Sequence, residues 1–439
     1  MRSLATAVVL LALGAGVLDA QQRDTLTRAQ RDSIAAADSI RLVRELERLQ
    51  NEPRAQPPSA PAGTTAGPTN PRLLPDISAV GDIVGDLSPD GSTLEDPSKR
   101  ADIREIEVAL QAAVDPYFRG DVFLGFNDEE GVAVEQAFLT TTALPQQIEL
   151  RIGRYLLPVG KINLTHRHDL HTIDYPWVVQ RFLGAEGLKG TGLWALRIFA
   201  PFGFYQELNV AVTDGFGERD EALVTAEPVN RRLSGLTYTA RLRNYWDLSQ
   251  AANLELSGTA ITGVRAQPIT PLAPDEEGVV VNAVGARQTL LGADLTYRWR
   301  PLQQGLYKSF ILQAELLRQL NADSPVSTPP LPAGGTPIEY LGPRRDVTGA
   351  YAFARWQTSR RGYVGGRYDY VQSYDAAIDP DLHAASLYLE FFPSEFSKLL
   401  LGYERVFQGG LGSGFGADAL HRLLLQATFA LGPHKPHPF

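Results

Sequence analysis

Residues 291–300 read LGADLTYRWR, and this stretch shows the pattern that decides the fold. Apolar side chains recur at every second position from Leu291 to Trp299, and the positions between them include Asp294 and Arg298. Because successive side chains of a β-strand point to opposite faces, this period predicts a strand with one apolar and one polar face. A length of about ten residues is what a tilted strand needs to cross a bilayer.

The same alternation returns along most of the chain. Strands of soluble proteins are usually about five or six residues long, and the alternating segments here are longer. Aromatic residues recur near the segment ends, where the aromatic girdles of a membrane barrel lie. We therefore predict strands at residues 78–88, 103–114, 117–127, 131–142, 147–156, 189–199, 203–213, 234–245, 252–262, 286–300, 309–320, 345–357, 362–372, 382–392, 396–407 and 420–431.

The connections between these segments alternate in length. Short connections fall at residues 115–116, 143–146, 200–202, 247–251, 358–361 and 393–395, and long ones at 157–188, 214–233, 263–285, 321–344 and 408–419. Bacterial outer-membrane barrels combine short periplasmic turns, long outer loops and an even number of strands. The sequence therefore predicts an all-β fold, a transmembrane antiparallel β-barrel of about 16 strands formed by residues 77–439.

The residues before the barrel divide into three segments. Residues 1–20 combine Arg2, an apolar run and the small residue Ala20, which is typical of a signal peptide. Residues 21–52 are rich in helix formers with a weak heptad pattern, and they predict a short periplasmic helix or coiled-coil segment; a single solvated helix fits as well. Residues 53–76 are rich in proline and alanine and predict a linker.

Composition argues against several classes of function. The formal net charge of -9 does not suit a nucleic-acid partner, which needs a basic face. The chain has no cysteine, so it forms neither disulfides nor thiolate metal sites. The sequence contains no hydrolase or zinc-protease motif, and we expect no enzyme activity, no catalytic residues and no cofactor.

Two stretches of the chain carry a family resemblance. Residues 106–126 read IEVALQAAVDPYFRGDVFLGF, and residues 148–176 read IELRIGRYLLPVGKINLTHRHDLHTIDYP, where a strand passes into a loop through Pro-x-Gly-Lys. With the order of segments, they resemble the phosphate-selective porin (porin O/P) family. The resemblance implies a homotrimer in the outer membrane of a diderm, Gram-negative bacterium, passive diffusion of solutes, and a third outer loop folded into the lumen.

The polar faces of the predicted strands depart from that family. Its phosphate channels line the lumen with ladders of Arg and Lys, whereas the inward positions here carry both signs of charge, so phosphate selectivity does not follow. The predicted lumen-facing residues are Glu105, Glu107, Glu149, Arg241, Arg243, Glu255, Asp294, Glu315, Arg367 and Asp369.

The loop 157–188 is the predicted site of selectivity, because it is the third outer loop in the strand count and the longest. We expect it to fold inward as a pore constriction. Its basic residues either form a positive ring that favours anions or pair with Glu149, Asp169 and Asp174. The predicted constriction residues are Arg151, Arg154, Lys161, His166, Arg167, His168, Asp169, His171 and Asp174.

Three histidines in this loop raise a second hypothesis. His166, His168 and His171 lie within six residues. His166 and His168 would share one face of an extended chain, and either His171 or Asp169 could complete a site, because imidazole with carboxylate suits zinc, copper or nickel. Their spacing matches no standard zinc signature, so the sequence favours pore lining, and these residues stay weak candidates for a metal site.

The sequence thus predicts a porin-type channel for passive diffusion of small hydrophilic solutes or ions. The alternatives are a metal- or ligand-binding transport protein that uses the histidine loop and a closed structural barrel. The expected partners are outer-membrane lipid, lipopolysaccharide and the solutes themselves.

Overall fold

The computed structural model describes the barrel part of the chain. It describes residues 75–89, 91–94, 96, 98–127, 131–214, 223–225, 233–275, 278–322, 325–327, 339–341, 345–373, 381–408 and 420–432. The predicted signal peptide, the helical segment and the linker up to residue 74 lie outside these described residues. Among the residues described, no helix is both long enough and apolar enough to cross a membrane.

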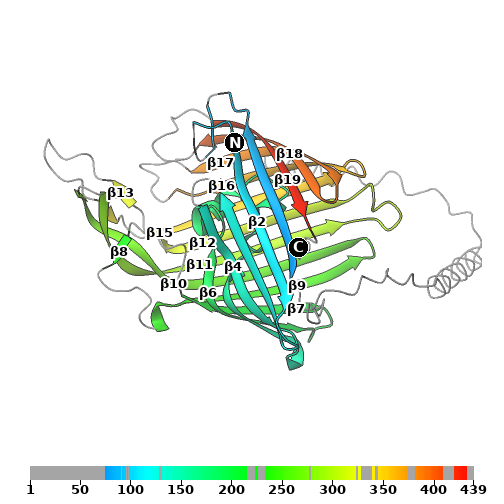
Figure 1. The fold of residues 1–439 in the computed structure, drawn as a ribbon, viewed down its shortest axis with the longest axis horizontal. Helices are drawn as coiled ribbons and strands as arrows, with labels where there is room; N and C mark the ends of the chain where they lie inside the picture. Colours follow the sequence, from blue (N-terminus) through cyan, green and yellow to red (C-terminus); the bar gives the residue numbers. More distant parts are fainter. Residues whose placement is uncertain are drawn as a thin grey trace, which may run out of the picture. The chain divides into compact units, whose positions relative to one another are not determined.

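Sixteen antiparallel strands form a closed barrel (Figure 1). Each wall strand pairs with the next one along the chain, and β1 also pairs with β19, from Ala79 opposite Leu431 to Asp86 opposite Leu424. The predicted fold class is therefore confirmed. The wall consists of β1 (Asp76–Asp86), β2 (Ala101–Ala113), β3 (Phe118–Asn127), β4 (Gly131–Thr141), β5 (Ile148–Leu156), β6 (Lys189–Phe199), β7 (Tyr205–Thr213), β9 (Thr237–Ser249), β10 (Ala252–Asp275), β11 (Gly278–Trp299), β12 (Phe310–Ala322), β15 (Arg345–Gln357), β16 (Gly362–Val371), β17 (Leu382–Ser394), β18 (Ser397–Gln408) and β19 (Leu420–Leu431).

The connections contain short elements of their own. The strand β8 runs parallel to part of β11, and β13 pairs with β14. These elements are η2 (Pro145–Gln147), β8 (Leu223–Thr225), η5 (Leu233–Gly235), β13 (Pro325–Ser327) and β14 (Glu339–Leu341).

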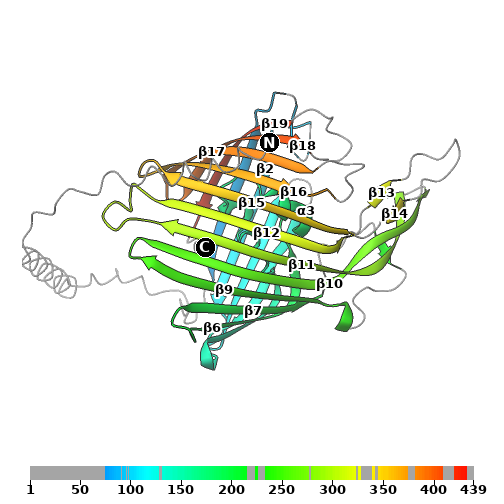
Figure 2. The same ribbon diagram turned by 180° about the vertical axis from the view of Figure 1, so that it is seen from behind.

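Strands β10 and β11 extend past the other strands as a long hairpin (Figure 2). The sequence predicted a loop at 263–285, but pairing continues until Asp275 lies opposite Gly278. The register shifts on both sides of Thr270, close to Pro268. Proline has no N–H to donate to the ladder, so the hairpin passes the prolines through irregular pairing instead of ending there. The prediction of a long loop was wrong at this connection.

The barrel wall is apolar outside and polar inside. Leu193, Leu387 and Leu389 on the outer face are 59%, 65% and 58% exposed, whereas Asp294 and Asp369 on the inner face are 1% and 0% exposed. A barrel surrounded by water would have the opposite arrangement, because exposed apolar area is unfavourable there. The outer face therefore suits lipid, and the polar inner face holds the charges discussed below.

Aromatic rings gather on the wall at one end of β11, β12 and β15. The rings of Trp299 and Trp356 stack with their centroids 5.7 Å apart, and Phe310 lies 5.9 Å from Trp356. This end carries the short connections, and aromatic rings at such a level are typical of a membrane–water interface.

Candidate functional site

Residues 157–188 join β5 to β6 and fold into a compact unit, called here the 157–188 segment. It contains η3 (Ile162–Leu164), η4 (Arg167–Asp169) and α3 (Trp177–Leu183), and α3 packs beside β15 and β16 (Figure 2). Its hydrogen bonds reach β2, β4, β10, β12 and β16 to β19. Strands β2 and β10 stand on nearly opposite sides of the sixteen-strand circle, so the segment is bonded to opposite walls.

An apolar core holds the segment against the wall. Val178 on α3 is 0% exposed, and a side chain on Gly349 of β15 would collide with it, so the glycine lets α3 approach the strand. Each buried side chain of this size stabilises the packed state by about 1.5–3 kcal/mol. The segment contributes the buried side chains Leu157, Val159, Leu170, Ile173, Tyr175, Val178, Val179, Phe182, Leu183 and Leu188.

The start of the segment is bonded to β10 and β12. The backbone N–H groups of Lys161 and Ile162 both donate to Oε1 of Glu315, at 3.1 and 2.7 Å. The Lys161 ammonium donates to Glu255 at 3.1 Å. Burial lowers the pKa of Lys161 to about 8 despite the Glu255 carboxylate, and Arg298 lowers it further. Glu255 also pairs with three arginines, Arg241, Arg243 and Arg298, so its negative charge is not devoted to Lys161 alone.

Asp174 is the most heavily paired carboxylate of the segment. Arg104 on β2 and Arg422 on β19 each donate to it at 2.9 Å, and Arg167 lies 3.5 Å away. Burial would raise the pKa of Asp174, but Arg422, Arg104 and Arg167 outweigh this effect and hold the pKa well below its usual range. The carboxylate is therefore charged at any physiological pH and links the segment to β2 and β19 on one side of the barrel.

Helix α3 begins on a carboxylate of the wall. The backbone N–H of Trp177 donates to Asp369 on β16 at 3.0 Å, and its indole N–H donates to Glu404 on β18 at 3.1 Å. Arg367 bonds Asp369 at 2.7 Å and donates to the Asp174 carbonyl at 2.8 Å. A helix start leaves its first N–H groups without helical partners, and Asp369 satisfies one of them.

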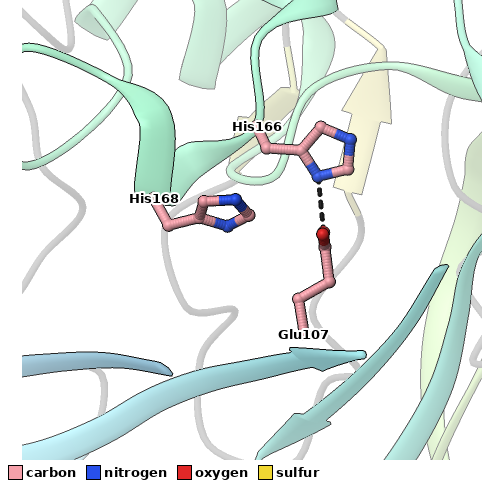
Figure 3. Close-up of side chains that lie close together, drawn as sticks. All are labelled: Glu107, His166 and His168. Atoms are coloured by element: carbon pink, nitrogen blue, oxygen red, sulfur yellow. Dashed lines mark hydrogen bonds and ion pairs between the residues drawn. The ribbon is translucent and has the colours of Figure 1, made fainter. Parts of the chain in front are cut away.

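The three histidines of the segment go to different partners. His166 approaches Glu107 through Nδ1 at 2.5 Å and Gln136 through Nε2 at 2.6 Å. His168 lies beside it, with ring centroids 5.5 Å apart (Figure 3). His171 instead faces Glu390 on β17 at 3.4 Å. Of the two residues considered as the third member of a site with His166 and His168, His171 therefore lies elsewhere, whereas Asp169 lies 3.7 Å from Nε2 of His168.

Burial and neighbouring charges shift the pKa values of these histidines in different directions. It lowers the pKa of His168, with only partial compensation from Asp169, and it lowers that of His171, with a further contribution from Arg355. For His166 burial acts in the same direction, but the Glu107 carboxylate outweighs it and raises the pKa.

The basic residues of the sequence-predicted site do not meet in one ring. Arg151 pairs with Glu149 at 2.8 Å and lies 4.4 Å above the Trp194 ring, and Arg154 interacts electrostatically with Glu186. With Arg167 beside Asp174, the positive charges are distributed among separate carboxylates. Of the two arrangements left open by the sequence, the structure shows ion pairing.

Four further predicted inner-face residues form ion pairs. Arg241 donates to Asp294 at 3.0 Å, and Arg243 donates to Glu255 at 2.9 Å. Glu105 is half-buried beside a small polar cavity of about 20 Å³.

Several residues that hold the segment were missing from the predicted site. Arg104, Lys398 and Arg422 bond its backbone or Asp174, and Glu390 and Glu404 bond its side chains. Period-two alternation already puts Glu390, Lys398, Glu404 and Arg422 of β17 to β19 on the polar face, so the inward pattern was the signal for these four. Arg104 instead lies on β2 at a register shift with β1, between Ile103 and Glu105, where simple alternation does not hold.

Two cavities of about 470 Å³ each lie beside the segment, and Lys161 borders both. One is lined by Arg298, Arg300, Arg355 and Arg360 with a single carboxylate, Asp169. The other has mixed charge, with lining that includes Arg119, Asp121, Glu149, Arg151, Glu207 and Arg243. Many of these residues adjoin the short connections, so the two spaces lie near that end of the barrel.

Comparison with known proteins gives few relatives in sequence and many in fold. No family model matches the chain. An uncharacterized protein of Aquifex aeolicus (strain VF5) is 28% identical over 358 residues, which are 76% of this chain and 69% of that protein. The outer membrane channel DcaP of Acinetobacter baumannii matches 82% of this chain and 98% of its own, with 13% identity and a TM-score of 0.51.

A second solved structure, OprB of Pseudomonas putida, matches 81% of this chain and 94% of its own, with 9% identity and a TM-score of 0.51. The chain has a porin-type barrel fold. At these identities the likeness concerns the fold, and the resemblance to phosphate-selective porins remains a prediction from the sequence.

Proposed function

We propose that the protein is a porin-type channel in the outer membrane of a Gram-negative bacterium, through which small hydrophilic solutes or ions diffuse passively. In this proposal the 157–188 segment is the constriction, and the end with the short connections faces the periplasm. The observation that carries the proposal is the bonding of one segment to opposite walls inside a barrel whose outer face is apolar. A sixteen-strand barrel is wide enough for an aqueous channel, and a segment across it narrows that channel.

The two cavities beside the segment support an aqueous route. They are bordered by charged side chains of both walls, and charged lining determines which ions pass. DcaP, which shares the fold, is itself an outer membrane channel. A trimer in contact with lipid and lipopolysaccharide remains part of this proposal through the family resemblance, and native mass spectrometry of the extracted protein measures the oligomeric state.

The apolar core of the segment favours a second candidate, a barrel that is closed at rest. Ten apolar side chains of the segment are buried, and a constriction that only lines an open pore does not need such a core. In this candidate the segment is a plug, and solute passes only after the plug moves. We propose no enzymatic activity for either candidate.

Deletion of residues 163–175 tests the constriction. The variant removes the histidines, Asp174 and part of the apolar core, so we expect a higher single-channel conductance in a planar bilayer. The control replaces residues 268–283, the end of the β10–β11 hairpin, with Asn-Gly, which shortens the barrel's outer extension without altering the segment. Unchanged conductance in the first variant, or an equal rise in the control, would overturn the constriction.

A further inference from the structure

Three metal-ligating side chains meet where the 157–188 segment touches β2 (Figure 3). Glu107 comes from β2, while His166 and His168 come from the two sides of Arg167 in the segment. One ligand atom of each residue lies within 4.8 Å of the other two. The three residues are 2%, 8% and 3% exposed, so bulk water is largely excluded from the group.

We propose that Glu107, His166 and His168 bind one divalent transition-metal ion of the Zn²⁺ class, which fastens the segment to β2. Two imidazoles and one carboxylate are ligands that such ions prefer, and the absence of cysteine from the sequence excludes a thiolate site. The site differs from the hypothesis drawn from the sequence, because Glu107, instead of His171 or Asp169, joins His166 and His168.

The present geometry needs only small movements to accept an ion. Nδ1 of His166 lies 2.5 Å from Oε2 of Glu107, a separation at which a proton joins the two atoms. Bonds of about 2.0–2.2 Å to a tetrahedral ion put its ligand atoms about 3.3 Å apart. The His166–Glu107 pair must therefore open by about 0.8 Å, while His168 moves inward by at most about 1.5 Å, and the ion takes the place of the proton.

The surroundings supply the outer contacts that metal-binding histidines use. The Gln136 amide lies 2.6 Å from Nε2 of His166, and its oxygen accepts the backbone N–H of Leu156 at 3.1 Å. A metal-bound His166 carries an N–H at Nε2, which this oxygen accepts only if the amide turns over and gives up the bond to Leu156. Asp169 lies 3.7 Å from Nε2 of His168 and can orient that ring or complete the coordination. The Phe123 ring, whose centroid lies 5.3 Å from that of the His166 ring, covers the site on one side.

Local charge also favours a cation. Glu105 and Glu135 lie near Glu107, and they border the cavity of about 20 Å³ beside His166, which has room for a water ligand. Lys189 and Arg167 border the same cavity, but Lys189 is already paired with Glu135 and Glu186, and Arg167 with Asp174.

The test measures metal bound to the full-length protein, extracted without a polyhistidine tag. In every sample His434 and His437 are replaced by alanine, which leaves the histidines of the segment and the two on the strands. The protein is incubated with Zn²⁺ or Co²⁺, desalted, and analysed for bound metal and for the visible absorption of Co²⁺. We expect about one ion per chain and a Co²⁺ spectrum typical of four-coordinate nitrogen and oxygen ligation.

Matched variants locate the ion. Glu107→Gln and His168→Gln keep the side-chain size and should reduce bound metal to near zero, and Gln136→Ala should weaken binding by about 10- to 100-fold through the lost outer contact. His171→Gln alters a histidine of the same segment outside the group and should retain one ion. Heat-dependent migration on gels verifies that each barrel is folded. The proposal would be overturned if the folded parent protein bound no metal, or if the folded Glu107→Gln and His168→Gln variants bound as much metal as the parent. The contact between the segment and β2 would then be a hydrogen-bonded one only.

Discussion

Replacement of Asp174 by asparagine should release the 157–188 segment from the wall without unfolding the barrel. Asparagine keeps the shape of the side chain but removes the charge that Arg104, Arg422 and Arg167 share. The side chains of Arg104, Arg422 and Asp174 are only 10%, 13% and 15% exposed, so water replaces little of the interaction lost between them.

The free-energy cost of Asp174→Asn depends on the carboxylate partners that the arginines keep. Removal of one partner of a buried ion pair costs about 3–5 kcal/mol. Here Arg104 still bonds Asp82 at 2.9 Å and Arg422 still bonds Glu404 at 2.9 Å, so neither arginine loses all of its partners. We therefore expect the lower end, about 3 kcal/mol, which raises the population of the released segment by about 100-fold.

Limited proteolysis of the folded protein measures that population. Cleavage within residues 157–188 should accelerate by about two orders of magnitude in Asp174→Asn when opening and closing are fast relative to cleavage. The matched control is Asp346→Asn, which breaks an exposed pair with Arg318 and should change cleavage little. Equal cleavage rates in the two variants would refute the reasoning.

Three further predictions follow from the same contacts. The pKa of Asp174 is held below its usual value, so the stabilisation of the docked segment by its carboxylate is present above pH 4 and is lost only as the pH falls through the lowered pKa. The rate of cleavage within the segment should therefore not change through this carboxylate between pH 5 and 8. A rise in the cleavage rate in that range, absent from Asp174→Asn, would contradict the expectation. Burial lowers the pKa of Lys161 to about 8, so a rise from pH 7 to 9 removes its positive charge, and the reversal potential in a salt gradient should shift towards cation preference. The variant Lys161→Gln should lack this shift, and an identical shift in that variant would exclude Lys161 as its cause. Gly160 has a φ of 58°, and a side chain there would collide with Glu315, so Gly160→Ala should break the backbone hydrogen bonds to Glu315 and accelerate proteolysis of the segment. Gly203 also has a positive φ, but the space around it is open, so Gly203→Ala should not accelerate this proteolysis.

Much of the wall could be predicted because its signal is local. Alternation depends only on neighbouring residues, and the predicted strands 189–199, 345–357 and 420–431 coincide with β6, β15 and β19. The hairpin extension of β10 and β11 was missed, since Pro268 and its neighbours are typical of a loop while the pairing depends on the partner strand.

The partners within the candidate site could be predicted less well. Arg104 and Asp174 are 70 residues apart, and Lys398 and His168 are 230 apart, so the bonds between them depend on the closure of the whole barrel. The sequence identified the segment and the polar face of each strand, but several carboxylates lie on that face at similar distances along the strands. Which one faces His166 and which faces His171 is decided by the three-dimensional path of the segment, and this is why Glu107 was assigned to the lumen alone.

Single-channel recording of the refolded protein in a planar bilayer tests the central claim most directly, because it measures whether water and ions cross the barrel with the segment in place. The proposed channel predicts discrete conductance steps with a defined ion preference, and larger steps after deletion of residues 163–175. A correctly folded barrel that gives no steps, and gains them only after that deletion, would contradict passive diffusion and show that the segment closes the barrel.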